Sequence, residues 1–416
     1  MRCAASGRPI WRWHAPLLAL PLLLVAPRMW AQSARALTLV DAVSIAQSRG
    51  GAVRLAAADS VLASTRRAAA ARLTNPALSA SYTENPPQQH AEVLVPADFL
   101  LLRASRVRAA TRLEAAARLR VAYQRAAARY AVTVAYARAA AASDRMRLSL
   151  RTAADADSLL VFAQQRERAG DASALDVELA RMNQGQFHAR ATQDSLARVL
   201  TMLGLQRELQ LPVDRMRVAL LDSLDGVLLA ELSPSDSTDG QRHTPLPVAI
   251  ATQAREATAA AVALERRRLL GVPAVSFGVE RNTAGDQRLL PTIGLSLPLP
   301  LLNRRGDIEI AQAERGRAEV ELEIATQNTR TAIAEAEQSA TLAAQRLEQV
   351  RALLASAERV ASLVLVAYRE GAATMPTVLD AARRARELRD EAISATTDLI
   401  NARAALRLYS TSDSTP

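Results

Sequence analysis

The chain has 416 residues with only 15 glycines and 3% aromatic residues, a composition that points to long helices and a mostly α-helical fold. Its formal charge is +10, but acidic residues are interspersed with the basic ones and few aromatics lie between them, which argues against a nucleic-acid-binding protein. The single cysteine, Cys3, excludes an intramolecular disulfide.

The N-terminal residues have the pattern of a secretory signal. Arginines up to Arg12 precede an apolar run at residues 15–26, and small residues permit cleavage after Ala31 or Ala36. The run is too short to span a bilayer as a helix. Residues 1–36 are therefore predicted to be a signal peptide with its cleavage region, and the protein is expected to be exported.

Residues 37–220 are predicted to form a first structural repeat. The expected elements, in chain order, are a helix over 38–73, strands at about 77–83 and 92–99, a long helix over 103–168 and a helix over 174–203. Both strands are predicted from alternating apolar and polar residues. The long helix contains no Pro and no Gly, so it is expected to reach roughly 99 Å.

Residues 221–247 read as a linker rich in Ser, Pro and Asp, and residues 248–409 are predicted to form a second repeat of the same plan. Its expected elements are a helix over 248–270, strands at about 274–280 and 292–299, a helix of roughly 95 Å over 307–369 and a last helix to about 408. Residues 410–416 remain as a C-terminal tail.

The tight turns that follow the two long helices match each other. Gly170 and Ser173 in the first repeat correspond to Gly371 and Thr374 in the second. Apolar residues, many of them Ala, recur at steps of three and four along the long helices, which predicts antiparallel coiled-coil pairs joined at these turns. Helix, hairpin, long helix, turn and helix therefore occur twice, as expected for an internal duplication.

The predicted hairpins need a partner surface, because isolated two-stranded hairpins are unstable and expose open edges. If lipid covers their apolar faces, the strands must belong to a closed barrel. Four strands are too few, since known membrane barrels begin at about eight, so several chains would have to contribute.

The duplicated plan, the two turns "RAGDASALDV" and "REGAATMPTVLD", and "LPLPLLNRRGDIEIAQAE" at 297–314 resemble the TolC-type outer membrane efflux channel family over essentially the whole mature chain. The motif "PLPLLNRRGDI" is most similar to the branch that serves efflux of heavy-metal cations of the cobalt-zinc-cadmium type. The resemblance implies a homotrimer in the outer membrane, in which four strands per chain build a twelve-stranded β-barrel and the long helices build a periplasmic α-barrel.

The same resemblance implies a passive exit duct for substrate from an inner membrane pump, usually of the resistance-nodulation-division class, reached through a periplasmic adaptor. Two alternatives stay open. The chain could be a drug or type I protein export duct of the same fold, or a periplasmic coiled-coil scaffold without a pore.

The turns carry the candidate functional residues. By resemblance, the adaptor-contact tips comprise Gly170, Ser173, Gly371 and Thr374. These residue types also suit a helix stop and an N-cap without any partner. Arg166 and Arg168, just before the first turn, are either adaptor contacts or solvated cations.

The predicted pore constriction comprises Asp380, Thr377 and Asp176, again by resemblance. Three copies of Asp380 around one axis would favour cations, whereas the alternative is a solvated aspartate near Arg383 and Arg384. The family often carries a second acid where this chain has Thr377. Asp176 also completes a capping-box pattern with Ser173, and the cap is the preferred interpretation.

No catalytic or cofactor-binding residues are predicted. The histidines are scattered at no metal-ligand spacing, and phosphate-binding Gly loops and nucleophile motifs are absent from the sequence. The chain is therefore expected not to be an enzyme and to need no cofactor, and any metal ions would be cargo.

Overall fold

The computed structural model describes residues 35–85, 87–212, 218–233, 244–269, 271–281, 288–297 and 305–410. The predicted signal peptide up to residue 34 lies outside this range, as do residues 298–304 of the family-like motif and residues 411–416 of the predicted tail.

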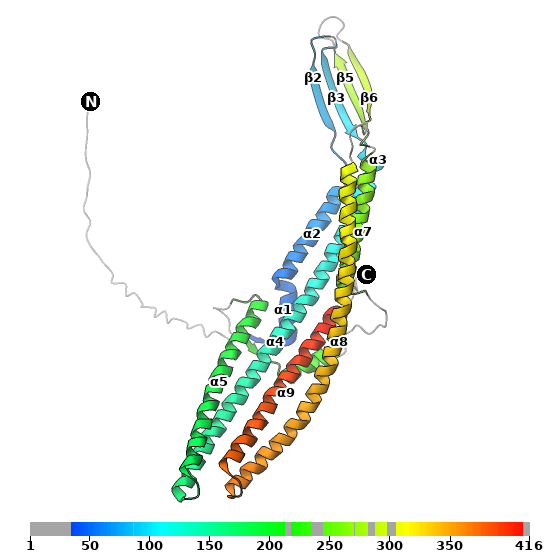
Figure 1. The fold of residues 1–416 in the computed structure, drawn as a ribbon. Coiled ribbons are helices and arrows are strands. Elements are labelled where there is room, and N and C mark those ends of the chain that lie inside the picture. Colours follow the sequence, from blue (N-terminus) through cyan, green and yellow to red (C-terminus); the bar gives the residue numbers. More distant parts are fainter. Residues whose placement is uncertain are drawn as a thin grey trace, which may run out of the picture.

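The molecule is elongated, with a small sheet at one end and two helical hairpins at the other (Figure 1). The segment predicted as the first repeat contains α1 (Leu39–Arg49), α2 (Gly51–Ala71), β2 (Ala77–Tyr82), β3 (Gln89–Pro96), α3 (Asp98–Leu101), α4 (Arg103–Ala169) and α5 (Ala174–Glu208). The segment predicted as the second repeat contains α7 (Leu246–Arg268), β5 (Ala274–Arg281), β6 (Leu289–Ser296), α8 (Arg305–Arg369) and α9 (Met375–Ser410). The predicted order of elements is therefore confirmed.

The long helices α4 and α8 extend through most of the body, and shorter helices pack against them end to end. α2 and α5 follow one another along α4, while α7 and α9 follow one another between α4 and α8 (Figure 1). Each long helix thus has packing partners along its length. The 67-residue helix α4 needs them, because helices in proteins gain most of their stability from tertiary packing.

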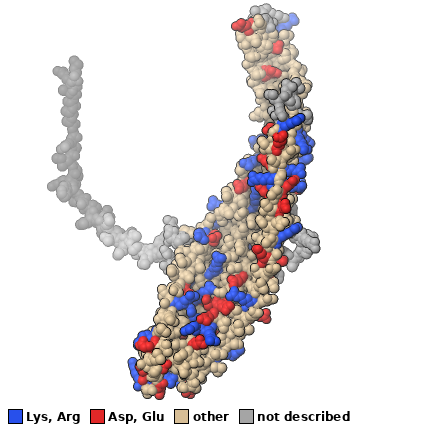
Figure 2. Space-filling model, viewed as in Figure 1, with Lys and Arg blue, Asp and Glu red and all other residues tan. Residues whose placement is uncertain are grey.

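Charge is distributed unevenly over this body. Acidic and basic side chains cover the helical part, whereas the face of the sheet that is visible in Figure 2 carries few of them. The two ends of the molecule therefore present different chemistry to their surroundings.

The helix predicted over 38–73 is interrupted, which corrects that prediction. Gly50 has extended backbone angles and separates α1 from α2. Gln210, at the end of α5, adopts a positive φ of 52°. With its amide oriented to satisfy both neighbours, its side chain donates to the carbonyl of Arg49 (3.2 Å) and accepts from the N–H of Gly51 (2.9 Å). A residue from another element therefore stabilises the break.

Two predicted strands are displaced. The strand expected at 92–99 is β3, Gln89–Pro96, because Asp98 instead begins the short helix α3 and is buried there. The strand expected at 292–299 is β6, Leu289–Ser296, because it pairs residue by residue with β5 as far as Leu289 opposite Arg281.

Part of the predicted linker is folded, which is a further correction. Within 221–247, α6 (Leu224–Leu232) buries Leu224, Val227 and Leu228 against the core of the helical body. Just before it, β4 (Val218–Leu220) pairs in parallel with β1 (Arg35–Leu37). The buried residues of α6 recur at steps of three and four, so one face of this helix lies against the body.

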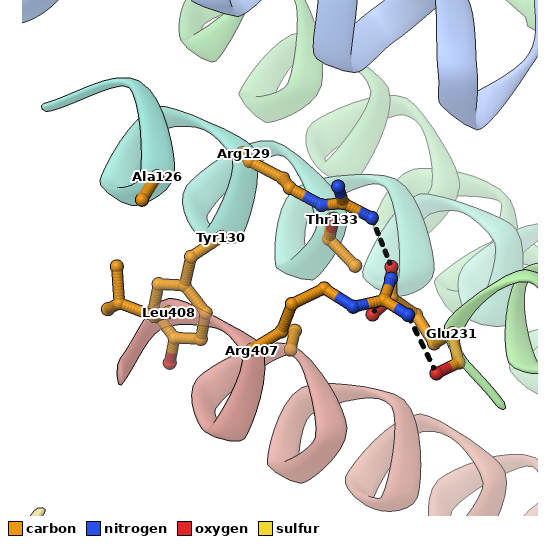
Figure 3. A pocket seen from close by; sticks show the side chains of 8 residues that line it. Ala126, Arg129, Tyr130, Thr133, Glu231, Arg407 and Leu408 are labelled. Atoms are coloured by element: carbon orange, nitrogen blue, oxygen red, sulfur yellow. Dashed lines mark hydrogen bonds and ion pairs between the residues drawn. The ribbon is translucent and has the colours of Figure 1, made fainter. Parts of the chain in front are cut away.

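Buried polar contacts hold α6 and the β1–β4 pair to the helical body. Arg407 of α9 donates to the carboxylate of Glu231 at 3.0 Å (Figure 3). It also donates to the carbonyl of Ser233, at the end of α6, at 3.1 Å. The Tyr136 hydroxyl of α4 donates to the Leu37 carbonyl at 2.9 Å, and burial raises the pKa of Tyr136 to about 12. α6 and the β1–β4 pair are therefore an integral part of the helical body.

Candidate functional site

The four strands of the distal end form one antiparallel sheet in the order β2-β3-β5-β6. The register places Leu78 opposite Val93, Val93 opposite Phe277, and Phe277 opposite Ile293, so one apolar row crosses all four strands on one face. Leu78 and Ile293 are 75% and 80% exposed. This apolar face has no cover within the described part of the chain, and a contiguous exposed apolar face normally marks an interaction surface.

The opposite face of the sheet is mostly polar, although Leu290 lies opposite Glu280 on it. Glu92 pairs with Ser79 on β2, and the next row along the strands places His90 opposite Glu280. Nδ1 of His90 lies 3.4 Å from Oε1 of Glu280. The outer edges of β2 and β6 make no strand pairs with other described residues. A sheet with one apolar face, one polar face and two open edges is suited to become a segment of a membrane barrel.

The tips of both helical hairpins have the predicted turn geometry. Gly170 and Gly371 have φ values of +83° and +78°, in the left-handed region that favours glycine after a helix. At the first tip, Ser173 and Asp176 form the predicted capping box. The Asp176 carboxylate accepts hydrogen bonds from the N–H (3.1 Å) and the hydroxyl (3.0 Å) of Ser173.

The second tip lacks that carboxylate cap. Thr374 and Thr377 occupy the equivalent positions, and their hydroxyl oxygens lie 3.0 Å apart. Pro376 follows the first residue of α9 and has no N–H to satisfy. The structure therefore brings together Ser173 with Asp176 and Thr374 with Thr377, and it gives the two tips different capping chemistry.

A side chain that the sequence left ambiguous joins the two tips. Arg166, at the end of α4, donates to the backbone carbonyl of Tyr368 at 3.0 Å and lies 4.9 Å from the centre of the Tyr368 ring. The edge of the same ring packs against Phe162. Around this contact lies an apolar cluster of residues from all four helix ends: Leu160, Ala163, Val177, Ala180, Tyr368, Met375, Val378 and Leu379. We call it the tip cluster.

Asp380 lies on the second turn of α9. Its carboxylate forms an ion pair with Nε of Arg384, four residues later, at 3.0 Å. Its side chain is 53% exposed, and in the described part of the chain it contacts neither Thr377 nor Asp176 through a hydrogen bond. Within one chain, the three residues predicted for the constriction are therefore not gathered into one cluster.

Comparison with known proteins gives this architecture a context. Residues 248–410 match the family model described as outer membrane efflux protein. No curated protein sequence matches the chain. The structure is similar to that of the outer membrane protein VceC from Vibrio cholerae, with a TM-score of 0.70, 16% identity, and coverage of 89% of this chain and 95% of VceC.

Two further outer membrane proteins of known structure are similar to this chain. CusC gives a TM-score of 0.71 with 14% identity, covering 97% of this chain and 99% of CusC. The chain has the fold of the outer membrane efflux channels. The open state of the MtrE outer membrane channel from Neisseria gonorrhoeae gives a TM-score of 0.65 with 16% identity, covering 89% of this chain and 88% of MtrE. The predicted fold class, mainly α with a small β part, is thereby confirmed.

The outer membrane efflux channel fold places the sheet and the tips at opposite ends of long helices. The matched family consists of efflux proteins and not of enzymes, which supports the prediction that this chain is not an enzyme. Among the described residues, no three His, Cys, Asp or Glu side chains gather into a group that could hold a metal ion.

Within the described ranges, no helix is both long and apolar enough to cross a membrane.

Proposed function

We propose that this protein is the outer membrane channel of a tripartite efflux system, a passive exit duct that receives substrate from an inner membrane pump through a periplasmic adaptor. The observation that carries the proposal is the distal sheet, with an exposed apolar face, a polar face and two open edges. The strands β5 and β6 have eight residues each, which is close to the roughly 9–11 residues that a tilted strand needs to cross the hydrocarbon core.

A homotrimer follows from strand arithmetic, since three sheets of four strands supply a barrel of twelve. The helices support the same assembly. α5 exposes apolar residues at heptad spacing, and α8 exposes others on its free side: Leu175, Met182, Leu196 and Leu203 on α5, and Leu342, Leu353 and Val360 on α8. These two helices lie at opposite sides of the lower helical layer, so α5 of one protomer is placed to pack on α8 of the next (Figure 1).

In this assembly the sheet lies in the outer membrane, the helices extend into the periplasm, and the tips meet the adaptor. Gly170, Ser173, Gly371 and Thr374 are the proposed adaptor contacts. The proposed cargo is heavy-metal cations, on the resemblance of residues 298–308, and drug or protein export by the same duct is the alternative. The pump proposed as partner is of the resistance-nodulation-division class. Residues 37–220 and 248–409 remain the proposed repeats.

The sheet proposal is tested by comparing two neighbouring residues on opposite faces. Ile293→Arg places a charge on the apolar face and should cost about 2–4 kcal/mol per protomer at the bilayer midplane. The variant is expected to be lost from the outer membrane fraction, and the trimer purified in mild detergent should disappear. Thr292→Arg, on the polar face, is the control and should yield a trimer that conducts ions in a planar bilayer.

If both variants assemble and conduct like the wild type, the apolar face does not contact lipid and the proposal fails. A soluble monomer or dimer of the wild-type protein, recovered without detergent, would support the periplasmic scaffold instead.

The constriction proposal predicts opposite effects of the two partners in the ion pair. Asp380→Asn should lower the preference of the isolated channel for cations over anions about twofold or more, because a ring of three carboxylates is lost. Arg384→Gln should raise this preference, because it removes the cation paired with each carboxylate. Reversal potentials in a salt gradient measure both. Asp171→Asn, in the first tip, is the control, and unchanged selectivity in Asp380→Asn would remove Asp380 from the constriction.

A further inference from the structure

A hollow of about 390 Å³, lined by both polar and apolar side chains, lies between α4, α5 and α9, away from both the sheet and the tips. Its floor is formed by Ala141 and Ala142, whose small side chains leave the space open. Arg145 lines one end, and Arg138, seven residues earlier on the same face of α4, lines the other. The hollow is of the size that holds a small molecule.

The end near Arg145 is internally neutralised. Arg145 donates to the Asp390 carboxylate and to the hydroxyl of Ser394, both at 2.6 Å. Asp194 is 6% exposed, accepts a hydrogen bond from Ser149, and lies 3.3 Å from Nε of Arg190. The carboxylates at this end are therefore already paired.

The remaining carboxylate of the lining is also paired. Oδ2 of Asp398 accepts from Nη1 of Arg346, on α8, at 3.1 Å. Each aspartate that lines the hollow therefore has a cationic partner.

The other end carries a cation that is not neutralised. Arg138 is exposed and makes no ion pair or hydrogen bond with any residue of the described ranges. Asn401 also lines the hollow, but its Oδ1 is buried, so a ligand in the hollow does not reach that atom. The hydroxyls of Thr201 and Thr397 donate to backbone carbonyls, at 3.0 and 2.8 Å, so their oxygens retain free lone pairs.

We propose that this hollow binds small hydroxylated organic anions, whose phosphate or carboxylate pairs with Arg138 and whose hydroxyls donate to Thr201 and Thr397. The planar guanidinium suits this role because it can give two parallel hydrogen bonds to such a group. An inorganic anion would bind only to Arg138, whereas a neutral polyol would donate only to the threonine hydroxyl oxygens. The site belongs to one protomer, so binding does not depend on the pore.

Isothermal titration of the full-length protein in detergent tests the site, with glucose 6-phosphate, inorganic phosphate and glucose as probes. One glucose 6-phosphate per chain is expected to bind, at least about tenfold more tightly than inorganic phosphate, and glucose should give no measurable heat. Arg138→Gln should weaken glucose 6-phosphate binding at least about tenfold. Thr397→Val should weaken glucose 6-phosphate binding while leaving phosphate binding unchanged.

Arg151→Gln is the matched control, because it removes one exposed arginine of the same helix outside the hollow, and it should bind like the wild type. Equal binding by the wild type and Arg138→Gln would overturn the proposal, as would an equal loss in Arg151→Gln. The absence of any heat with glucose 6-phosphate in the wild type would overturn it as well.

Discussion

Replacing Arg166 with alanine is expected to raise the conductance of the isolated channel several-fold, because this side chain ties the two hairpin tips of a protomer together. It contributes a charge-assisted hydrogen bond to the Tyr368 carbonyl and a cation–π contact with the Tyr368 ring. At a partly exposed site the two contacts together are worth about 2–3 kcal/mol. If opening requires the tips to separate, this loss favours the open state by a factor of about 30 or more per protomer.

The tip cluster remains in the Arg166→Ala variant, so the hairpins should still fold. Arg168→Ala is the matched control, since Arg168 lies on the same turn, is exposed, and makes no hydrogen bond or ion pair with any residue in the described ranges. Single-channel recordings of both variants without an adaptor measure the effect. Equal conductance of the two variants would show that the Arg166 contact does not restrain the pore.

Tyr368 offers a second check on the same contact. Its hydroxyl is buried and has no hydrogen-bond partner among the described residues, and burial raises its pKa. Tyr368→Phe therefore keeps the ring and the carbonyl that Arg166 uses, and it removes an unsatisfied polar group. This variant should conduct like the wild type, because it leaves the Arg166 contact intact. An increase as large as that of Arg166→Ala would assign the restraint to the hydroxyl instead.

The sequence predicted the parts of the fold that depend on local rules. Uninterrupted helical composition from Arg103 onward predicted α4, and the glycine turns predicted left-handed residues that the structure has at Gly170 and Gly371. The capping box of Ser173 and Asp176 follows from a four-residue pattern, so it too was predictable. Each of these features is specified by residues close together in the chain.

The features that sequence reasoning missed depend on residues far apart in the chain. The break at Gly50 is stabilised by Gln210, and the contact between the tips joins Arg166 to Tyr368. Only the glycine pair at 50–51 and the aromatic residue close to the second turn were visible as local signals. The sheet joins two hairpins through β3 and β5, which no local pattern specifies. Tertiary packing decides these positions.

The junction between sheet and helices depends on one buried carboxylate, and the corresponding prediction concerns Arg106. Asp98 is 3% exposed and accepts hydrogen bonds from Thr74 (2.7 Å) and from Arg106 (3.0 Å). Arg106 also donates to the carbonyls of Ala70 and Arg72, at the end of α2. One guanidinium therefore fastens α2, α3 and α4 together directly beneath the strands.

Arg106→Ala is expected to destabilise the protein by about 2–4 kcal/mol, because it leaves a buried carboxylate with Thr74 as its remaining partner. Arg103→Ala is the control: among the described residues Arg103 donates only to the carbonyl of Ala71, so its replacement should cost about 1 kcal/mol. Thermal unfolding of the detergent-solubilised protein, followed by circular dichroism, compares the two. A loss in Arg106→Ala no larger than that in Arg103→Ala would contradict the proposed role of the pair.

The pH dependence of stability tests whether the Asp98 carboxylate causes the loss of stability in Arg106→Ala. Burial alone would raise the pKa of Asp98, but the hydrogen bonds from Thr74 and Arg106 outweigh burial and hold the pKa below its usual value. The stabilisation is therefore complete above the unfolded-state pKa of about 3.9 and is lost as the pH falls through the lower folded-state pKa. In Arg106→Ala, burial dominates and the pKa should rise, so this variant should regain stability between pH 7 and 5 while the wild type does not. A parallel pH dependence of the two proteins over that range would mean that Asp98 remains stabilised as a carboxylate without Arg106.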